Sequence, residues 1–229
     1  MTFKELFTSF KPSFDAIPLT EKFRSAAAAF CGILLLGLAL HFLPDAGYPL
    51  ILFASMAAAS VLLYAAPHSP MAQPWPLVVG NLLSGTVGWG CSLVIPDPLL
   101  AGACAVGLAI LVMHLSHALH PPGGATALII VLAADQFHQH GWLWATSVTL
   151  ANTLLSLLLA LTINNLIHLG RYPLQHRHRV LPKADVTPAT LTPENIEWAL
   201  QKMEGVIDAD EEDLLKIYRL ATEHAQKNK

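Results

Sequence analysis

The chain has 229 residues, of which 54% are hydrophobic and 13% charged, and its formal net charge is −3. No Lys or Arg occurs between Ser25 and Gly170, and the only acidic residues there are Asp45, Asp97 and Asp135. Helices of a soluble domain need a charged face, so this composition excludes a soluble fold for the region and predicts an all-α, polytopic transmembrane helix bundle. We expect a lipid bilayer around it and no nucleic-acid partner.

Residues 1–24 mix aromatic, basic and acidic residues and lack the pattern of a cleaved signal peptide. We interpret them as a cytoplasmic leader ahead of the membrane region, residues 25–170. Membrane helices are predicted from Ser25 to Leu43 and from Tyr48 to Ala65. The second is rich in Ala and Ser, and such small residues let membrane helices approach closely and favour a homo-oligomer.

The segment from Ala66 to Pro76, APHSPMAQPWP, contains four prolines and no charge. The prolines are expected to exclude a helix. One interpretation is that the segment folds back into the protein at membrane depth, where irregular backbone must be buried or line a cavity. His68, Ser69 and Gln73 are then candidate substrate-binding residues. The alternative is an uncharged cytoplasmic turn.

A third membrane helix is predicted from Leu77 to Ile95. Its Asn81 would be costly facing lipid, so we expect it to point inward as a pore-lining or structural group. A Pro-Asp-Pro turn leads into a fourth helix from Leu99 to Leu119. There His114, a further pore-lining or structural group, lies one turn from His117 on a shared face.

The most specific stretch is HLSHALHPPGGATAL, residues 114–128. Pro121 and Pro122 should break the incoming helix near Leu119 and allow a new one to begin. Unpaired amides in the first turn of the new helix, with nearby hydroxyl and imidazole groups, would form a seat for a small anion. The candidate substrate-binding residues here are His117, His120, Gly123, Gly124, Ala125 and Thr126. The alternative is a tight turn between two buried helices in which every polar group is bonded internally.

The apolar run after this motif, Ala125 to Ala134, is much shorter than the roughly 20 residues that span a bilayer. We predict a half-helix whose N-terminus lies inside the membrane, an arrangement by which transporters face an anionic substrate. The alternative is a helix that continues through Phe137 and crosses the bilayer at a tilt.

A polar turn, DQFHQHG, precedes the last membrane helix, Trp142 to Leu169. Its polar positions include Asn152 and Asn164, which are again pore-lining or structural groups. Basic residues cluster before the first helix and after the last, so both termini are predicted to be cytoplasmic, with about six membrane segments. We expect a multi-pass protein of a bacterial inner membrane.

Residues 171–229 are predicted to form a small soluble tail. Helix-start signals at Thr192 and near Asp210 indicate a helical hairpin there. The three cysteines have no paired or metal-binding spacing, and we expect neither a metal site nor a cofactor.

Two segments together, APHSPMAQPWP at residues 66–76 and HALHPPGGATAL at residues 117–128, resemble the HPP family of integral membrane proteins. The family is named for the triplet present here as His120, Pro121 and Pro122. Family members in cyanobacteria and chloroplasts are known as nitrite transporters, so the resemblance implies transport of nitrite or a similar small anion.

The resulting hypothesis is a transporter and not an enzyme. The anion would bind between the helix start at Gly123 and residues 68–73, and His117 or His120 would carry a coupling proton. Two alternatives stay open: a divalent-metal or cation transporter that uses the histidines, and a membrane metalloenzyme with His114, His117 and His120 as ligands. In the enzyme, these ligands would diverge around a helix and lack a nearby carboxylate.

Overall fold

The computed structural model describes residues 18–41, 53–167 and 172–173. These residues form helices and connecting turns with no β-strand among them, so the predicted all-α class is confirmed. The chain divides into two compact units: Arg24–His176, and the terminal segments Met1–Phe23 with Arg177–Lys229. Most of the expected leader and the whole expected C-terminal hairpin lie outside the described residues.

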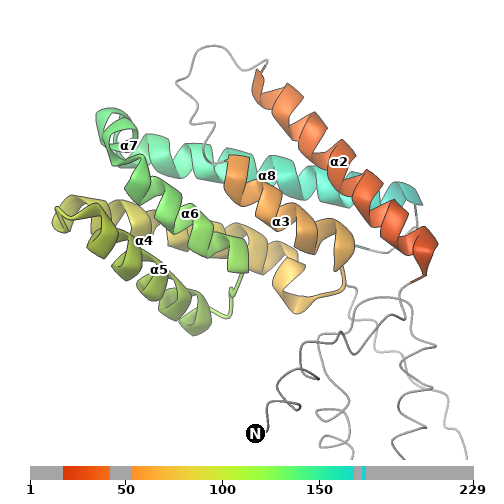
Figure 1. Ribbon diagram of the computed structural model, residues 1–229, viewed down its shortest axis with the longest axis horizontal. Helices are drawn as coiled ribbons and strands as arrows, with labels where there is room; N and C mark the ends of the chain where they lie inside the picture. The colour runs from red at the N-terminus through yellow and green to blue at the C-terminus, as the bar shows by residue number, and fades with distance from the viewer. Residues whose placement is uncertain (1–17, 42–52, 168–171, 174–229) are drawn as a thin grey trace, which may run out of the picture. The chain divides into compact units, whose positions relative to one another are not determined.

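The described helices follow one another through short connections, and Figure 1 labels them. They are α2 (Leu19–His41), α3 (Phe53–Ala65), the 3-10 helix η2 (Pro70–Ala72), the π-helix η3 (Pro76–Gly80), α4 (Asn81–Val94), α5 (Pro98–Leu115), α6 (Pro121–Leu132), α7 (Ala134–His140) and α8 (Trp142–Ile167). Because η3 runs directly into α4, the two form one continuous helical stretch.

Four described helices are long and apolar enough to cross a membrane. They are Leu19–His41, Pro76–Val94, Pro98–Leu115 and Trp142–Leu166, and two shorter apolar helices, Ala54–Ala65 and Pro121–Leu132, accompany them. These helices correspond to the six predicted membrane segments. The short segment after the motif is α6, which has 12 residues. At a rise of about 1.5 Å per residue, α6 reaches little more than half of a hydrocarbon core about 30 Å thick.

The start of α2 lies at Leu19 and not at Ser25, where the sequence predicted it. The carbonyl of Pro18 accepts hydrogen bonds from the amides of Glu21 and Lys22 at 3.0 and 3.2 Å. Polar residues therefore supply the first turn of a helix whose later part is apolar.

Helical structure within residues 66–76 corrects the expectation that four prolines exclude it. Pro70 opens η2, and residues 74 and 75 are already helical. Gln73 has an extended backbone, and its carbonyl accepts the Leu77 amide at 3.0 Å. The two later prolines therefore fall in a first helical turn, where a missing amide hydrogen costs little.

The end of α5 lies four residues before the predicted end at Leu119. His117 takes a left-handed backbone conformation with φ of 50°. The His117 amide bonds to the carbonyl of His114 at 3.1 Å, and the Ala118 amide bonds to the carbonyl of Met113 at 2.8 Å. These two bonds form a Schellman motif, which ends a helix and satisfies its last carbonyls.

The residues DQFHQHG form the short helix α7 and not the expected polar turn. A break at Ala133, with φ of −107° and ψ of 29°, separates α7 from α6, so α6 does not continue through Phe137 as one helix. Asp135 in the first turn of α7 and two histidines in its last turn complement the helix dipole. Gly141, with φ of 82°, ends the helix.

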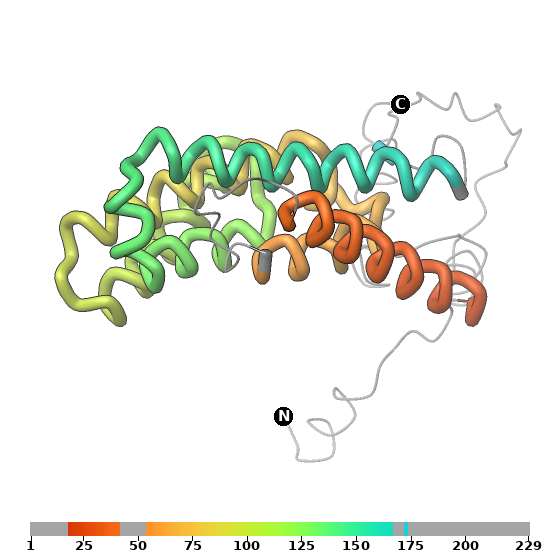
Figure 2. Tube along the Cα trace, turned by 90° about the horizontal axis from the view of Figure 1, so that it is seen from above, coloured from red at the N-terminus to blue at the C-terminus, as the bar shows by residue number. Residues whose placement is uncertain are grey.

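α4, α5 and α6 make the most extensive contacts with one another, and Figures 1 and 2 show them side by side. Small residues set the spacing between α4 and α6. A Cβ atom built on Gly88 would collide with the backbone of Ala127, whose Cα would lie 2.9 Å away, and one on Gly80 would lie 2.6 Å from the carbonyl oxygen of Ala118. The two helices thus pack backbone against backbone at Gly88, and η3 packs at Gly80 against the turn before α6.

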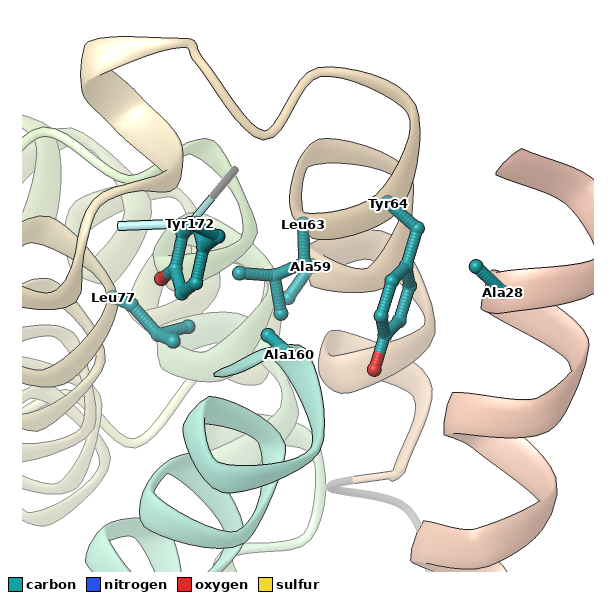
Figure 3. Packing of buried hydrophobic residues seen from close by; sticks show 7 residues of the cluster. All are labelled: Ala28, Ala59, Leu63, Tyr64, Leu77, Ala160 and Tyr172. Carbon is teal, nitrogen blue, oxygen red and sulfur yellow. The ribbon is translucent and has the colours of Figure 1, made fainter. Parts of the chain in front are cut away.

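A second packing cluster joins α2, α3, α8 and the segment after α8. Figure 3 shows the ring of Tyr172 beside Leu77 and Leu63, and that of Tyr64 turned toward α2. The Tyr172 hydroxyl donates to the carbonyl of Ala72 at 2.8 Å. Asn164 on α8 donates to the carbonyl of Leu63 on α3 at 3.0 Å. This cluster holds the η2 segment between α3 and the end of α8.

The α4–α6 contact gives a direct test of the packing. Gly88→Ala should lower the free energy of unfolding by about 1–3 kcal/mol, because the new methyl group meets backbone that cannot turn away. Gly90→Ala is the matched control, since a Cβ there meets nothing within 4 Å. Thermal unfolding of the purified protein in detergent measures both, and equal stability of the two variants would contradict the contact.

Candidate functional site

Four polar side chains lie fully buried where the N-terminal halves of α4 and α6 cross. They are Asn81, Ser84, His120 and Thr126, and we call them the α4–α6 polar cluster. No Lys or Arg lies between Ser25 and Gly170, and the acidic residues Asp97 and Asp135 lie at the start of α5 and in α7. The cluster is therefore polar but contains no fixed charge.

His120 is placed by the end of α5 and the start of α6. The prolines after it begin α6, and His120 is the N-cap residue, with extended backbone and no side-chain capping bond. Its ring turns to η2, where Nδ1 lies 2.9 Å from the carbonyl oxygen of Met71. A carbonyl can only accept, so Nδ1 carries a proton, and in the neutral ring Nε2 is an acceptor.

Asn81 and Thr126 join α4 to α6 through a short hydrogen bond. The Thr126 hydroxyl donates to Asn81 Oδ1 at 2.7 Å, and Asn81 Nδ2 donates to the carbonyl of Leu77 at 2.8 Å. The Asn81 side chain thus has partners on both sides. Sequence analysis expected Asn81 to point inward, and the structure places it there with Thr126 as its partner.

Two atoms of the cluster have no hydrogen-bond partner among the described residues: Ser84 Oγ and His120 Nε2. A Cβ atom built on Gly123 would lie 2.7 Å from Ser84 Oγ, and one built on Gly80 would lie 2.9 Å from His120 Cβ. Gly80 and Ser84 are one turn apart on one helical stretch, and His120 and Gly123 are three residues apart. Ser84 Oγ therefore lies beside Gly123, and the His120 side chain begins beside Gly80, one turn before Ser84.

The amides at the start of α6 differ from the expected anion seat. The Gly123 amide donates to the carbonyl of His120 at 2.8 Å, so the expectation that it is unpaired is wrong. Pro121 and Pro122 carry no amide hydrogen. Gly124 and Ala125, also predicted as substrate-binding residues, are half-buried, and a Cβ on Gly124 would lie 3.8 Å from Val106 Cγ1.

The polar side chains of residues 66–73 hold the shape of their own loop. Ser69 is buried, and its hydroxyl accepts the Met71 amide at 3.3 Å. Gln73 Nε2 donates to the carbonyls of Pro67 and Ser69 at 3.0 and 2.9 Å. His68 is half-buried. This loop contacts the cluster through the Met71 carbonyl, which accepts a hydrogen bond from His120 Nδ1.

The other histidines of the motif lie apart from the cluster. His114 and His117 are exposed, and His117 serves the backbone turn that ends α5. The expectation that His117 sits on the α5 helix with His114 is wrong, because the helix has ended before it. Among the described residues, no group of three His, Cys, Asp or Glu side chains could hold a metal ion.

Two predicted polar positions of α8, Asn152 and Asn164, are buried. Asn152 is buried, and its carbonyl accepts the Ser156 hydroxyl at 2.9 Å. Asn164 bonds to carbonyls on α3 and on α8 itself. These bonds favour a structural role for Asn164 over a pore-lining role.

Sequence reasoning missed two residues of this region. Ser84 looked like one of several small packing residues of α4, and its sequence position does not distinguish it from them. Tyr172 lies just after α8, yet its hydroxyl donates to the Ala72 carbonyl. The preceding carbonyl, of Met71, accepts from His120. No local sequence pattern indicates a contact across 100 residues.

The fold and the cluster together define a polytopic helical membrane protein with a buried, uncharged polar site. A family model described as HPP, transmembrane region, matches residues 15–173, so the chain belongs to the HPP family of membrane proteins. The resemblance inferred from the two motifs is confirmed. Membership is consistent with a membrane transporter.

Two transmembrane proteins of Dictyostelium discoideum are similar to this chain. One is 40% identical over 150 residues, which are 64% of this chain and 48% of the relative. The other is 39% identical over 152 residues, which are 64% of this chain and 53% of the relative. The chain thus spans about half the length of these curated relatives. No solved structure matches it. The bacterial inner membrane and the cytoplasmic termini stay predictions.

The Asn81–Thr126 bond can be tested by removing its donor. Thr126→Val leaves Asn81 Oδ1 unsatisfied in the interior and should lower the free energy of unfolding by about 1–2 kcal/mol. In an Asn81→Leu background the same change should cost clearly less. The control is Thr86→Val, because the exposed Thr86 hydroxyl bonds to the Leu82 carbonyl of its own helix. Equal effects of both Thr→Val changes on thermal unfolding would exclude the proposed coupling.

The left-handed conformation of His117 predicts an unusual response to glycine. His117→Gly should leave the stability unchanged or raise it by up to about 1 kcal/mol, since glycine relieves the cost of that conformation while adding freedom to the unfolded chain. Ser116→Gly should instead be destabilising by about 0.5–1 kcal/mol, because the φ of Ser116 is −95°. Thermal unfolding separates the two, and a clear loss of stability in His117→Gly would contradict the assigned role.

Proposed function

We propose that this protein transports a small inorganic anion, with nitrite as the first candidate, and that the anion binds at the α4–α6 polar cluster. The observation that carries the proposal is the pair of fully buried atoms without partners among the described residues, Ser84 Oγ and His120 Nε2. Buried polar atoms without partners are rare in proteins, and each is costly. A ligand that supplies their missing hydrogen bonds would offset that cost.

The chemistry of the cluster suits a monoanion that must also be released. Ser84 offers a hydroxyl donor, and a protonated His120 would offer Nε2–H, whereas the Thr126 hydroxyl already donates to Asn81 Oδ1. No lysine or arginine is present to hold the anion permanently, and a transport site must bind weakly enough to let its substrate leave. Nitrite is the first candidate because the resemblance to the HPP family implies it.

Binding at the cluster requires the protein to open. The orphaned atoms are inaccessible in this conformation, and a Cβ on Gly123 would contact both Ser84 Oγ and the sulfur of Met113, at 2.7 and 3.0 Å. The structure is therefore interpreted as a closed form. We expect access to come from movement of the η2 segment, whose Met71 carbonyl holds His120.

A metal or cation transporter and a metalloenzyme receive no support from the site. Both need several metal ligands in one place, whereas the exposed His114 and His117 lie apart from the buried His120.

Nitrite uptake into liposomes containing the purified protein tests the proposal. We expect protein-dependent uptake that falls about tenfold or more in Ser84→Ala, because a hydrogen bond to a charged ligand is lost. Thr86→Val, with an exposed hydroxyl on the same helix, should transport at the wild-type rate. Uptake equal to that of protein-free liposomes would overturn nitrite as the substrate, and the same result with nitrate and formate would overturn anion transport.

A further inference from the structure

The orientation of the His120 ring determines where it can exchange a proton. Nδ1 lies 2.9 Å from the Met71 carbonyl oxygen, and this bond requires a proton on Nδ1 in both charge states of the ring. The titrating position is therefore Nε2, the buried atom without a partner among the described residues. In the neutral ring Nε2 carries a lone pair, and a lone pair repels an anion that comes within its reach.

A protonated His120 would have no counter-charge in the protein. The groups that the structure places against it are the Met71 carbonyl on η2 and the backbone of Gly80 on η3, and neither titrates. Titratable side chains on the adjoining segments are His68 in the loop before η2, the exposed His114 and His117 at the end of α5, and Tyr172, whose hydroxyl is bonded to Ala72. None of these is a carboxylate.

The site therefore binds neither the proton alone nor the anion alone favourably. An anion without the proton faces the Nε2 lone pair, and a proton without the anion leaves a buried charge unpaired, which is expensive in a protein interior. Bound together they form a neutral pair: Nε2–H donates to one anion oxygen and the Ser84 hydroxyl donates to another. Two ligands that each improve the binding of the other are thermodynamically coupled.

We propose that the cluster binds one proton on His120 Nε2 for every anion, so that the protein is an electroneutral proton–anion symporter and Ser84 is a further anion-binding residue. This inference rests on the proposed function and specifies its energetics. No covalent bond to the anion forms or breaks. The proton comes from water on one side, travels with the anion, and returns to water on the other side.

The test measures charge and protons during nitrite uptake into liposomes, with internal pH followed by a trapped dye and the membrane potential set by a potassium gradient and ionophore. Initial rates are corrected for uptake by protein-free liposomes, because nitrous acid crosses lipid without a protein. We expect uptake that acidifies the interior by one proton per nitrite, that responds to the pH gradient, and that does not change with membrane potential.

Two variants test the assigned atoms. His120→Asn can keep a donor for the Met71 carbonyl but has no titratable group, and it should lower the proton-coupled rate about tenfold or more. Ser84→Ala should mainly raise the half-saturating nitrite concentration, again about tenfold, while keeping the stoichiometry of one proton. Thr86→Val serves as the control for both.

The outcomes separate this inference from the proposed function. Nitrite uptake that carries net charge and follows the membrane potential would overturn the symport and leave anion transport standing. No protein-dependent uptake of nitrite, nitrate or formate would overturn both. The charge measurement uses the wild-type protein, so it decides the question even if His120→Asn fails to fold.

Discussion

The structure depends on the close approach of α4 and α6. The backbone of α6 at Ala127 lies where a side chain on Gly88 would have to go, and the turn before α6, at Ala118, lies where one on Gly80 would have to go. Lipid tails are as apolar as leucine, and helix association in a membrane therefore relies on close packing and interhelical hydrogen bonds more than on the hydrophobic effect. The Asn81–Thr126 bond, at 2.7 Å, supplies such a bond at the same crossing.

This packing also explains why a polar cluster can exist inside so apolar a chain. Small residues bring α4 close enough to α6 for short side chains such as Ser84 to reach the start of α6. The η2 segment adds its carbonyls from the side: Met71 accepts from His120, and Ala72 accepts from Tyr172. Consecutive carbonyls of one short helix are thus held by residues 49 and 100 positions away along the chain. A movement of η2 would disturb both contacts together.

The sequence predicted the membrane region well because its signals are local. Apolar runs without charge indicate membrane helices, and Pro121 with Pro122 indicates the break before α6. Predictions failed where two signals competed. The left-handed His117 ends α5 early although no glycine stands there, and Asp135 helps to make a helix of residues that composition favours as a turn.

The site was predictable only in part, because its decisive features are pairings between distant segments. His120 and Thr126 could be chosen from the motif, whereas Ser84 acquires a role only when Gly123 lies against it. The protonation of His120 shows this limit most clearly. Either ring nitrogen could carry the proton, and only the contact with the Met71 carbonyl shows that Nδ1 carries it. Since that carbonyl fixes one proton on Nδ1, Nε2 is the acceptor in the neutral ring. The proposed coupling of proton to anion therefore rests on the backbone of η2, a segment 49 residues earlier in the chain.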